Sequence, residues 1–204
     1  MIQSMAPTSR SSSGPDLQST LAALRRDRER YSELGGWARN TGYWIGATYR
    51  LGRWARAIDS RAVRLPLLVL HRLLELPWKF FLNVDIQAAR IGPGLCLIHP
   101  RNVWIAGGTV LGRDCLVFHE VTFGTNAFVE GKPRLGDRVD VYVGARILGR
   151  VTIGDDAMIG ANCVVTRDVP AGHAVLPAKT VQAPRALLGL APRPLPSDGE
   201  PSEE

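Results

Sequence analysis

The stretch that decides the fold runs from residue 105 to residue 169 and reads IAGGTVLGRDCLVFHEVTFGTNAFVEGKPRLGDRVDVYVGARILGRVTIGDDAMIGANCVVTRDV. An aliphatic or aromatic residue recurs in it at every sixth position: Ile105, Leu111, Val117, Phe123, Val129, Leu135, Val141, Ile147, Ile153, Ile159 and Val165. A second series, mostly of small residues, stands four residues after each of these: Thr109, Cys115, Val121, Ala127, Pro133, Val139, Ala145, Val151, Ala157, Cys163 and Val169. A period of six fits neither an amphipathic helix nor a simple strand, and it is typical of hexapeptide β-helices.

Each hexapeptide is expected to supply one short strand and one corner, so that three of them form a triangular coil filled by the bulky aliphatic side chains. Four glycines that directly follow an aliphatic position suit backbone geometries that a Cβ would strain: Gly112, Gly136, Gly154 and Gly160. Successive coils would stack at about 4.8 Å, the spacing of hydrogen-bonded strands. The pattern therefore predicts a left-handed parallel β-helix, a mainly β fold.

The repeat also indicates where the β-helix begins and what covers its first coil. The six-residue spacing also holds earlier in the chain, at Ile91, Leu97 and Val103, but it resumes at Ile105, two residues later than Val103. This shift predicts a two-residue insertion at one corner. The β-helix is then expected to begin near Val84. The first coil would expose an unpaired edge, which repeat proteins normally cap. Three helices are expected to cap it, within residues 17–34, 38–58 and 65–82.

We therefore expect four segments along the chain. Residues 1–15 form a disordered leader, residues 16–83 an α-helical domain, residues 84–170 the β-helix, and residues 171–204 an exit segment with an acidic, proline-rich tail.

Size and composition fit a globular protein of one or two domains, since 45% of the 204 residues are apolar. The longest apolar stretch without a charge, residues 65–71, is far shorter than the roughly 18 residues that a membrane-spanning helix needs. The cysteines at positions 96, 115 and 163 are odd in number and lack CxxC spacing, so neither a disulfide framework nor a zinc site is indicated. A cytoplasmic protein without a transmembrane segment is expected.

The formal net charge is +6, and many of the arginines lie between Arg25 and Arg72. We interpret them as the solvated faces of helices and expect no nucleic-acid partner, because no aromatic residues interleave with a basic stripe. A polyanionic small molecule would also suit this charge.

Four histidines are candidate general bases, because imidazole accepts a proton near neutral pH. His71 lies in an apolar helical segment and is interpreted as structural, whereas the role of His173 stays open. His99 and His119 each stand two residues after an aliphatic wall position and are 20 residues apart, one coil of 18 plus the insertion. Both imidazoles are therefore expected on one outer face, one coil apart, where one could act as base and the other bind substrate. The alternative is an exposed pair without a function.

Residues 125–134 keep the period only weakly and are interpreted as a loop lifted out of the coil, with Gly131 and Lys132 in its middle. Such a loop could close a site on a neighbouring subunit or be a plain surface excursion. Cys115 and Cys163 are seven or eight hexapeptides apart, and neither number is a multiple of three. They are therefore expected on different walls, too far apart for a disulfide, and burial argues against a nucleophilic role.

Three fragments carry a resemblance to a known family: VDIQAARIGPGLCLIHP (84–100), CLVFHEVTFG (115–124) and VYVGARILGRVTIGDDAMIGANCVVTRDVP (141–170). They resemble the serine acetyltransferases and their relatives in polysaccharide and natural-product pathways, which are left-handed β-helices that use acetyl-CoA. The resemblance covers residues 84–179, and the preceding helices resemble that family's helical domain. By this resemblance His99 falls at the catalytic base, and Asp85, after a one-residue gap, falls at the carboxylate that orients it.

The resemblance further implies that the acceptor hydroxyl attacks the thioester directly, through an oxyanion and without an acyl-enzyme. It implies a homotrimer, which could pair into a hexamer through the N-terminal helices, with CoA bound in a groove between adjacent subunits. The matching cofactor-binding positions are Gly124, Thr125, Gly144, Ala145, Ala161 and Lys179.

The departures from the family fall where it recognises serine. Ile98 stands in place of an aspartate. Gly131-Lys132 replaces an Arg-His pair that, in the family, clamps the carboxylate of the substrate. The usual GVPA is reduced to LPA at Leu176, and the chain ends in Glu204 in place of the isoleucine that docks into cysteine synthase, so that complex is not expected. We therefore expect an acceptor other than free serine. Its pocket would be shaped by His119, Glu120, Lys132 and Ile98.

The leading hypothesis is an acetyl-CoA-dependent O-acetyltransferase without a metal, acting on a hydroxyl of a small metabolite, a sugar or a glycan intermediate. One alternative is a true serine acetyltransferase with re-sited substrate contacts. A second is a non-catalytic β-helix scaffold, or one that binds zinc through histidines of neighbouring subunits.

Overall fold

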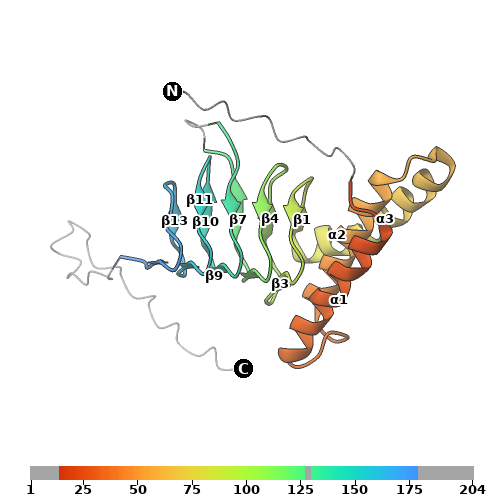
Figure 1. Ribbon diagram of the computed structural model, residues 1–204. Coiled ribbons are helices and arrows are strands. Elements are labelled where there is room, and N and C mark those ends of the chain that lie inside the picture. The colour runs from red at the N-terminus through yellow and green to blue at the C-terminus, as the bar shows by residue number, and fades with distance from the viewer. Residues whose placement is uncertain (1–13, 127–129, 179–204) are drawn as a thin grey trace, which may run out of the picture.

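The computed structural model describes residues 14–126 and 130–178. These residues form three helices followed by a left-handed parallel β-helix of about five turns, as the six-residue period predicts. Figure 1 shows the helices gathered at one end of the β-helix, next to β1, with β13 near the other end. The expectations for residues 1–13, Ala127, Val129, Lys179 and the tail lie outside the described residues.

Local capping side chains set the beginnings of two of the helices. Asp16 accepts a hydrogen bond of 2.7 Å from the Ser19 N–H and so caps α1 (Leu17–Glu33). Asn40 accepts one of 3.1 Å from the Gly42 N–H, which starts α2 at Thr41 and not at residue 38. The third helix, α3 (Arg61–Leu82), begins four residues earlier than expected and ends at Asn83 in the left-handed conformation. Both α1 and α3 pack against α2.

Within residues 14–126 and 130–178, fourteen short strands form three parallel walls. Wall A consists of β1 (Val84–Ile86), β4 (Val103–Ile105), β7 (Thr122–Gly124), β10 (Arg146–Leu148) and β13 (Val164–Val165). Wall B consists of β2 (Arg90–Ile91), β5 (Val110–Leu111), β8 (Arg134–Leu135) and β11 (Thr152–Ile153). Wall C consists of β3 (Cys96–Leu97), β6 (Leu116–Val117), β9 (Asp140–Val141), β12 (Met158–Ile159) and β14 (Ala174–Val175). The aliphatic positions of the repeat point inward and make up the buried core.

Strand pairing confirms the two-residue insertion and places it in one corner. Leu97 pairs with Val117, 20 residues later, whereas Ile105 pairs with Phe123, 18 residues later. The two additional residues therefore lie between β3 and β4. Val103 is buried on the same strand as Ile105, so it takes the small-residue position of the repeat and not the aliphatic position that its spacing from Leu97 suggested.

The loop that leaves the coil is six residues longer than an ordinary corner. Val110 on β5 pairs with Arg134 on β8, 24 residues later, against the 18 of a regular coil. Because six residues is the length of one hexapeptide, the sequence period continues through the loop as if the coil were uninterrupted. Cys115 and Cys163 precede strands of walls C and A, so the prediction that they lie on different walls is confirmed.

A column of glycines at the corner after wall B allows neighbouring coils to approach closely. Gly92, Gly112, Gly136 and Gly154 stack in it, and a Cβ on Gly112 would lie 2.3 Å from the Gly136 carbonyl oxygen. None of these four glycines has a φ in the left-handed region. They are therefore needed because a neighbouring coil is too near for a Cβ, and not because of turn geometry.

Replacing Gly112 by alanine is expected to lower the free energy of unfolding by about 1–3 kcal/mol, because the added methyl group meets backbone that cannot yield without shifting a coil. Gly107 is a matched control, since the nearest atom to a Cβ there is 3.7 Å away and its φ is not positive. Urea unfolding of Gly112→Ala and Gly107→Ala measures the difference. Equal stabilities of the two variants would contradict the close-approach explanation.

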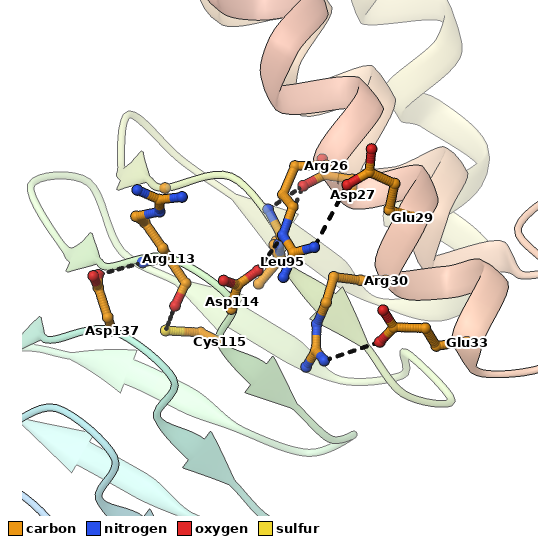
Figure 2. Close-up of polar contacts among 12 residues, drawn as sticks. Arg26, Asp27, Glu29, Arg30, Glu33, Leu95, Arg113, Asp114, Cys115 and Asp137 are labelled. Atoms are coloured by element: carbon orange, nitrogen blue, oxygen red, sulfur yellow. Dashed lines mark hydrogen bonds and ion pairs between the residues drawn. The ribbon is translucent and has the colours of Figure 1, made fainter.

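A buried ion pair caps the first coil from the helical side. Asp27 on α1 accepts hydrogen bonds from the Gly94 N–H at 2.7 Å and the Leu95 N–H at 3.2 Å, and Figure 2 shows it pointing at Leu95. Arg50 on α2 donates to Asp27 at 2.8 Å and to the Gly92 carbonyl at 2.8 Å. Arg50 therefore does not belong to a solvated helix face, as the arginine-rich composition suggested, because it is only 6% exposed.

Two tyrosine hydroxyls satisfy further backbone groups of the first coil. The Tyr31 hydroxyl accepts from the Leu97 N–H at 2.6 Å, and burial raises its pKa. The Tyr49 hydroxyl accepts from the Ile91 N–H at 3.2 Å and donates to the Ala89 carbonyl at 3.1 Å. Side chains of α1 and α2 thus occupy the place that a preceding coil would take, which is how the exposed edge is avoided.

The remaining groups singled out in the sequence are mostly structural. His71 is 3% exposed, and burial lowers its pKa; a Cβ on Gly52 of α2 would lie 2.4 Å from its ring. All three cysteines are buried and free, and burial raises the pKa of Cys96 and of Cys115 to about 11, as expected of inert thiols. Among the described residues no helix is both long enough and apolar enough to cross a membrane.

Candidate functional site

Most of the candidate residues lie along one edge of the prism, where wall C turns into wall A. We call this the C–A edge; it comprises residues 98–102, 118–121, 142–145 and 160–163 of successive coils. Hydrogen bonds between the coils tie it together. The Gly144 N–H donates to the His119 carbonyl at 3.2 Å, and the Asn162 N–H donates to the Val143 carbonyl at 2.8 Å. The predicted base and the predicted cofactor residues Gly144 and Ala161 therefore share one edge.

His99 lies in the corner that contains the two-residue insertion, and it faces a hollow of about 400 Å³. Its backbone has a φ of 48°, in the left-handed region, and its side chain is exposed. The other lining residues come from the first corner and from the connection between α1 and α2: Leu34, Arg39, Asn40, Thr41, Ile98 and Pro100. The insertion thus carries an imidazole out to a hollow that the helical domain completes.

His119 follows β6 as His99 follows β3, so the two histidines stand on the same edge one coil apart. The Ile98 N–H donates to the Val117 carbonyl at 2.8 Å, which fixes the relative register of the two corners. His119 is half-buried, and its Nδ1 is buried without a hydrogen-bond partner among the described residues. Glu120 is exposed beside it, with its N–H bound to the Arg101 carbonyl at 2.7 Å.

Asp85 is not joined to His99 by a hydrogen bond within the described part of the chain. It lies on β1 of wall A, where its Oδ1 is 3.1 Å from the Nζ of Lys79 on α3. The same Nζ is 3.4 Å from Glu75. Lys79 therefore holds the Asp85 carboxylate beside α3. The role of Asp85 in orienting His99 stays a prediction.

The loop residues lie at the opposite edge of wall A from His99. Gly124 ends β7 and Thr125 follows it, where wall A turns into wall B. Lys132 lies over Gly108 at the same edge, since a Cβ on Gly108 would be 3.3 Å from its Cγ. Within one chain, wall A thus separates Gly124, Thr125 and Lys132 from the His99 hollow.

The other predicted cofactor residues differ in how far they can be reached. Ala145 is fully buried, its N–H bonded to the Tyr142 carbonyl and its carbonyl to the Thr122 N–H. Ala161 is half-buried at the C–A edge. Lys179 lies outside the described residues. The described residues hold no group of three or more His, Cys, Asp or Glu side chains that could bind a metal ion.

Sequence reasoning missed the residues that the helical domain contributes to the hollow. Arg39, Asn40 and Thr41 lie nearly 60 residues before His99 in the chain and carry no repeat signal. The one available sign was the break after Gly35-Gly36, which marks a connection but not the corner that it meets.

Comparisons with known proteins point to one family, although no protein-family model matches the chain. The serine acetyltransferase of Helicobacter pylori strain J99 is 41% identical over 104 residues, which cover 50% of this chain and 61% of that protein. The serine acetyltransferase of Mycobacterium tuberculosis is 40% identical over 97 residues, or 46% of this chain and 42% of that protein. The chain thus spans less than two thirds of these curated relatives.

Solved structures give the same picture over more of the chain. Soybean serine acetyltransferase, as the apoenzyme, is 30% identical with a TM-score of 0.62 and covers 78% of this chain and 67% of its own. The Neisseria gonorrhoeae enzyme in complex with serine is 27% identical with a TM-score of 0.61, over 79% and 68%. The Brucella abortus enzyme in complex with coenzyme A, 23% identical with a TM-score of 0.64 over 80% and 67%, shares the fold. The chain belongs to the serine acetyltransferase-like family of hexapeptide-repeat proteins.

Proposed function

We propose that this protein transfers the acetyl group of acetyl-CoA to a hydroxyl of a small acceptor, with His99 as the general base. The observation that carries the proposal is the placement of His99 in a hollow on the same edge as Gly144 and Ala161, the positions that match the family's cofactor site. The imidazole takes the hydroxyl proton as the acceptor oxygen attacks the thioester carbonyl. The tetrahedral oxyanion then collapses, the carbon–sulfur bond breaks, and the CoA thiolate leaves with that proton.

The complete site is proposed to form between two adjacent chains of a trimer. In one chain, His99 and the loop residue Lys132 lie at opposite edges of wall A. When subunits pack around a threefold axis, the C–A edge of one chain can meet the loop edge of the next. This arrangement brings Gly124, Thr125 and Lys132 to the His99 hollow, as the family resemblance implies.

L-serine is the acceptor that we propose first, in place of the sugar or glycan acceptor expected from the sequence. The relatives are serine acetyltransferases, and Arg39 lines the hollow together with His99. A guanidinium binds a carboxylate through paired, charge-assisted hydrogen bonds. Arg39 is therefore proposed to replace the carboxylate clamp that the loop lost when Gly131-Lys132 took the place of the Arg-His pair.

A hydroxy acid without an amino group is the second candidate acceptor. Ile98 stands in the hollow where the family has an aspartate, and no carboxylate side chain is among the residues that line the hollow within the described chain. An ammonium group would find no counter-charge there. Glycerate, which has a hydroxyl where serine has its amino group, represents this class.

Release of free thiol from acetyl-CoA, measured with L-serine, glycerate and serinamide as acceptors, tests the proposal. L-serine or glycerate is expected to support turnover, and serinamide, which lacks the carboxylate, to be at least about tenfold poorer in kcat/KM. Arg39→Ala is expected to raise the KM for the carboxylate acceptors by about tenfold or more with kcat nearly unchanged, because it removes binding common to ground and transition states.

Arg25→Ala provides the control, since Arg25 is an exposed arginine on α1, 84% exposed, outside the hollow. It removes the same charge and should leave KM unchanged. Equal activity with serinamide and L-serine would refute the role of Arg39. Absence of thiol release with every hydroxylated acceptor would refute acetyl transfer itself.

A further inference from the structure

The outer face of α3 is apolar over its whole length and packs against nothing among the described residues. Its exposed residues are Ala62, Val63, Leu65, Pro66, Val69, Leu70, Leu73, Leu74, Leu76, Pro77, Phe80 and Phe81. At 3.6 residues per turn these positions fill about half of the helix circumference, and no charged residue falls among them. Phe80 and Phe81 are 79% and 83% exposed. A soluble surface rarely presents so continuous an apolar face without a partner.

The opposite face of α3 is the one that the rest of the protein uses. His71 packs against Gly52 of α2, and the Trp78 Nε1–H donates to the Thr48 hydroxyl of α2 at 3.3 Å. The apolar face is therefore separate from the side by which α3 packs on the rest of the protein.

The charges beside the apolar face are positive. The helix has four basic residues and one acidic residue, Glu75. Glu75 faces inward, with its side chain 14% exposed, and is paired with Arg72 at 2.9 Å and Lys79 at 3.4 Å. Arg61, Arg72 and Lys79 fall along one side of the apolar face on the helical period, and the Arg72 side chain is 65% exposed.

We propose that α3 docks on an anionic lipid surface, lying in the plane of the membrane with its apolar face among the acyl chains and its basic rim at the headgroups. Leucine and phenylalanine on one face with arginine and lysine beside it are the composition of interfacial helices.

Two observations favour lipid over a second copy of the chain as the occupant. One partner helix covers a stripe narrower than half the circumference, whereas a membrane interface covers the full face. Two copies joined through α3 would also bring like charges together, because the four basic residues of the helix outnumber its one acidic residue, Glu75. Charge complementarity therefore points to anionic headgroups.

Co-sedimentation of the full chain with vesicles of phosphatidylcholine mixed with phosphatidylglycerol tests this docking, without substrates, so its result does not depend on acetyl transfer. Wild-type protein is expected to bind these vesicles and to bind pure phosphatidylcholine more weakly. Phe80→Ser combined with Phe81→Ser should weaken binding by at least about tenfold. The matched control is Leu17→Ser with Leu21→Ser, which removes two exposed apolar side chains of α1, 51% and 56% exposed, and should leave binding unchanged.

Charge variants separate the basic rim from net charge. Arg72→Gln should weaken binding to the anionic vesicles by about fivefold, whereas Arg25→Gln on α1, which changes the net charge equally, should have little effect. Unaltered thermal melting shows that each variant folds. Wild-type protein that does not bind anionic vesicles would overturn the proposal. So would a Phe80/Phe81 variant whose sedimentation coefficient falls while its lipid binding persists, since the face would then join copies of the chain.

Discussion

Replacing His99 by alanine is expected to lower kcat/KM for acetyl transfer by two to four orders of magnitude, the range that a positioned general base supplies. The alanine variant can still bind both substrates, but the attacking hydroxyl keeps its proton. The fold should not suffer, because His99 is exposed in a corner and makes no side-chain hydrogen bond among the described residues. Thiol release from acetyl-CoA under saturating acceptor measures the effect.

His173→Ala is the matched control for this variant. His173 is also exposed, but it directly precedes β14 of wall C in the last coil, with its Nδ1 2.9 Å from the Ala171 carbonyl oxygen. Its removal should leave turnover at the wild-type value. A His99→Ala variant that retains wild-type turnover would exclude His99 as the base and leave His119 as the other histidine of the C–A edge as defined above.

Replacing Arg50 by alanine is expected to lower the free energy of unfolding by about 3–5 kcal/mol, the largest stability effect that we foresee in this protein. The change leaves the Asp27 carboxylate buried without its counter-charge and deprives the Ile91 and Gly92 carbonyls of donors. For a domain with a typical margin of about 5–15 kcal/mol, this loss is a large fraction of the total. Urea unfolding followed by circular dichroism measures it.

Arg138→Ala tests whether burial is the cause. Arg138 and Asp156 form an ion pair of similar geometry, with Nη2 2.8 Å from Oδ2, but the two side chains are 53% and 57% exposed. Solvent-exposed pairs contribute little, so this variant should unfold at the wild-type urea concentration. Comparable losses of unfolding free energy in the two variants would mean that burial does not strengthen the Asp27–Arg50 pair and that the cap depends on other contacts.

The fold could be predicted from the sequence because a period of six has no other simple structural explanation. Each coil repeats the same inward aliphatic position, so the walls follow directly from the register of residues such as Val117 and Val141. The corner insertion was also predictable, since it shifts that register by two. The place of Val103 was misassigned because both the aliphatic and the small-residue positions accept valine.

The site was less predictable because its parts come from segments without a common period. The edge that bears His99 and His119 follows from the repeat, but the hollow needs Arg39 from a helix connection. The Asp27–Arg50 pair was hidden in an arginine-rich composition that suggested only solvated faces. A periodic pattern reports what faces the interior of the coil, and it contains no information on which outside segment docks against a corner.

The position of His99 in the first coil has a consequence for how firmly this proposed base is held. Inner coils have a neighbour above and below, whereas this one has a coil on one side and helices on the other. In stacked repeats the terminal unit opens most easily, so amide hydrogens of β3 should exchange faster than those of β6 unless the helices compensate. Because side chains of α1 and α2 bond the first coil, a substitution that loosens those contacts is expected to speed amide exchange at β3 before it lowers the melting temperature of the whole β-helix.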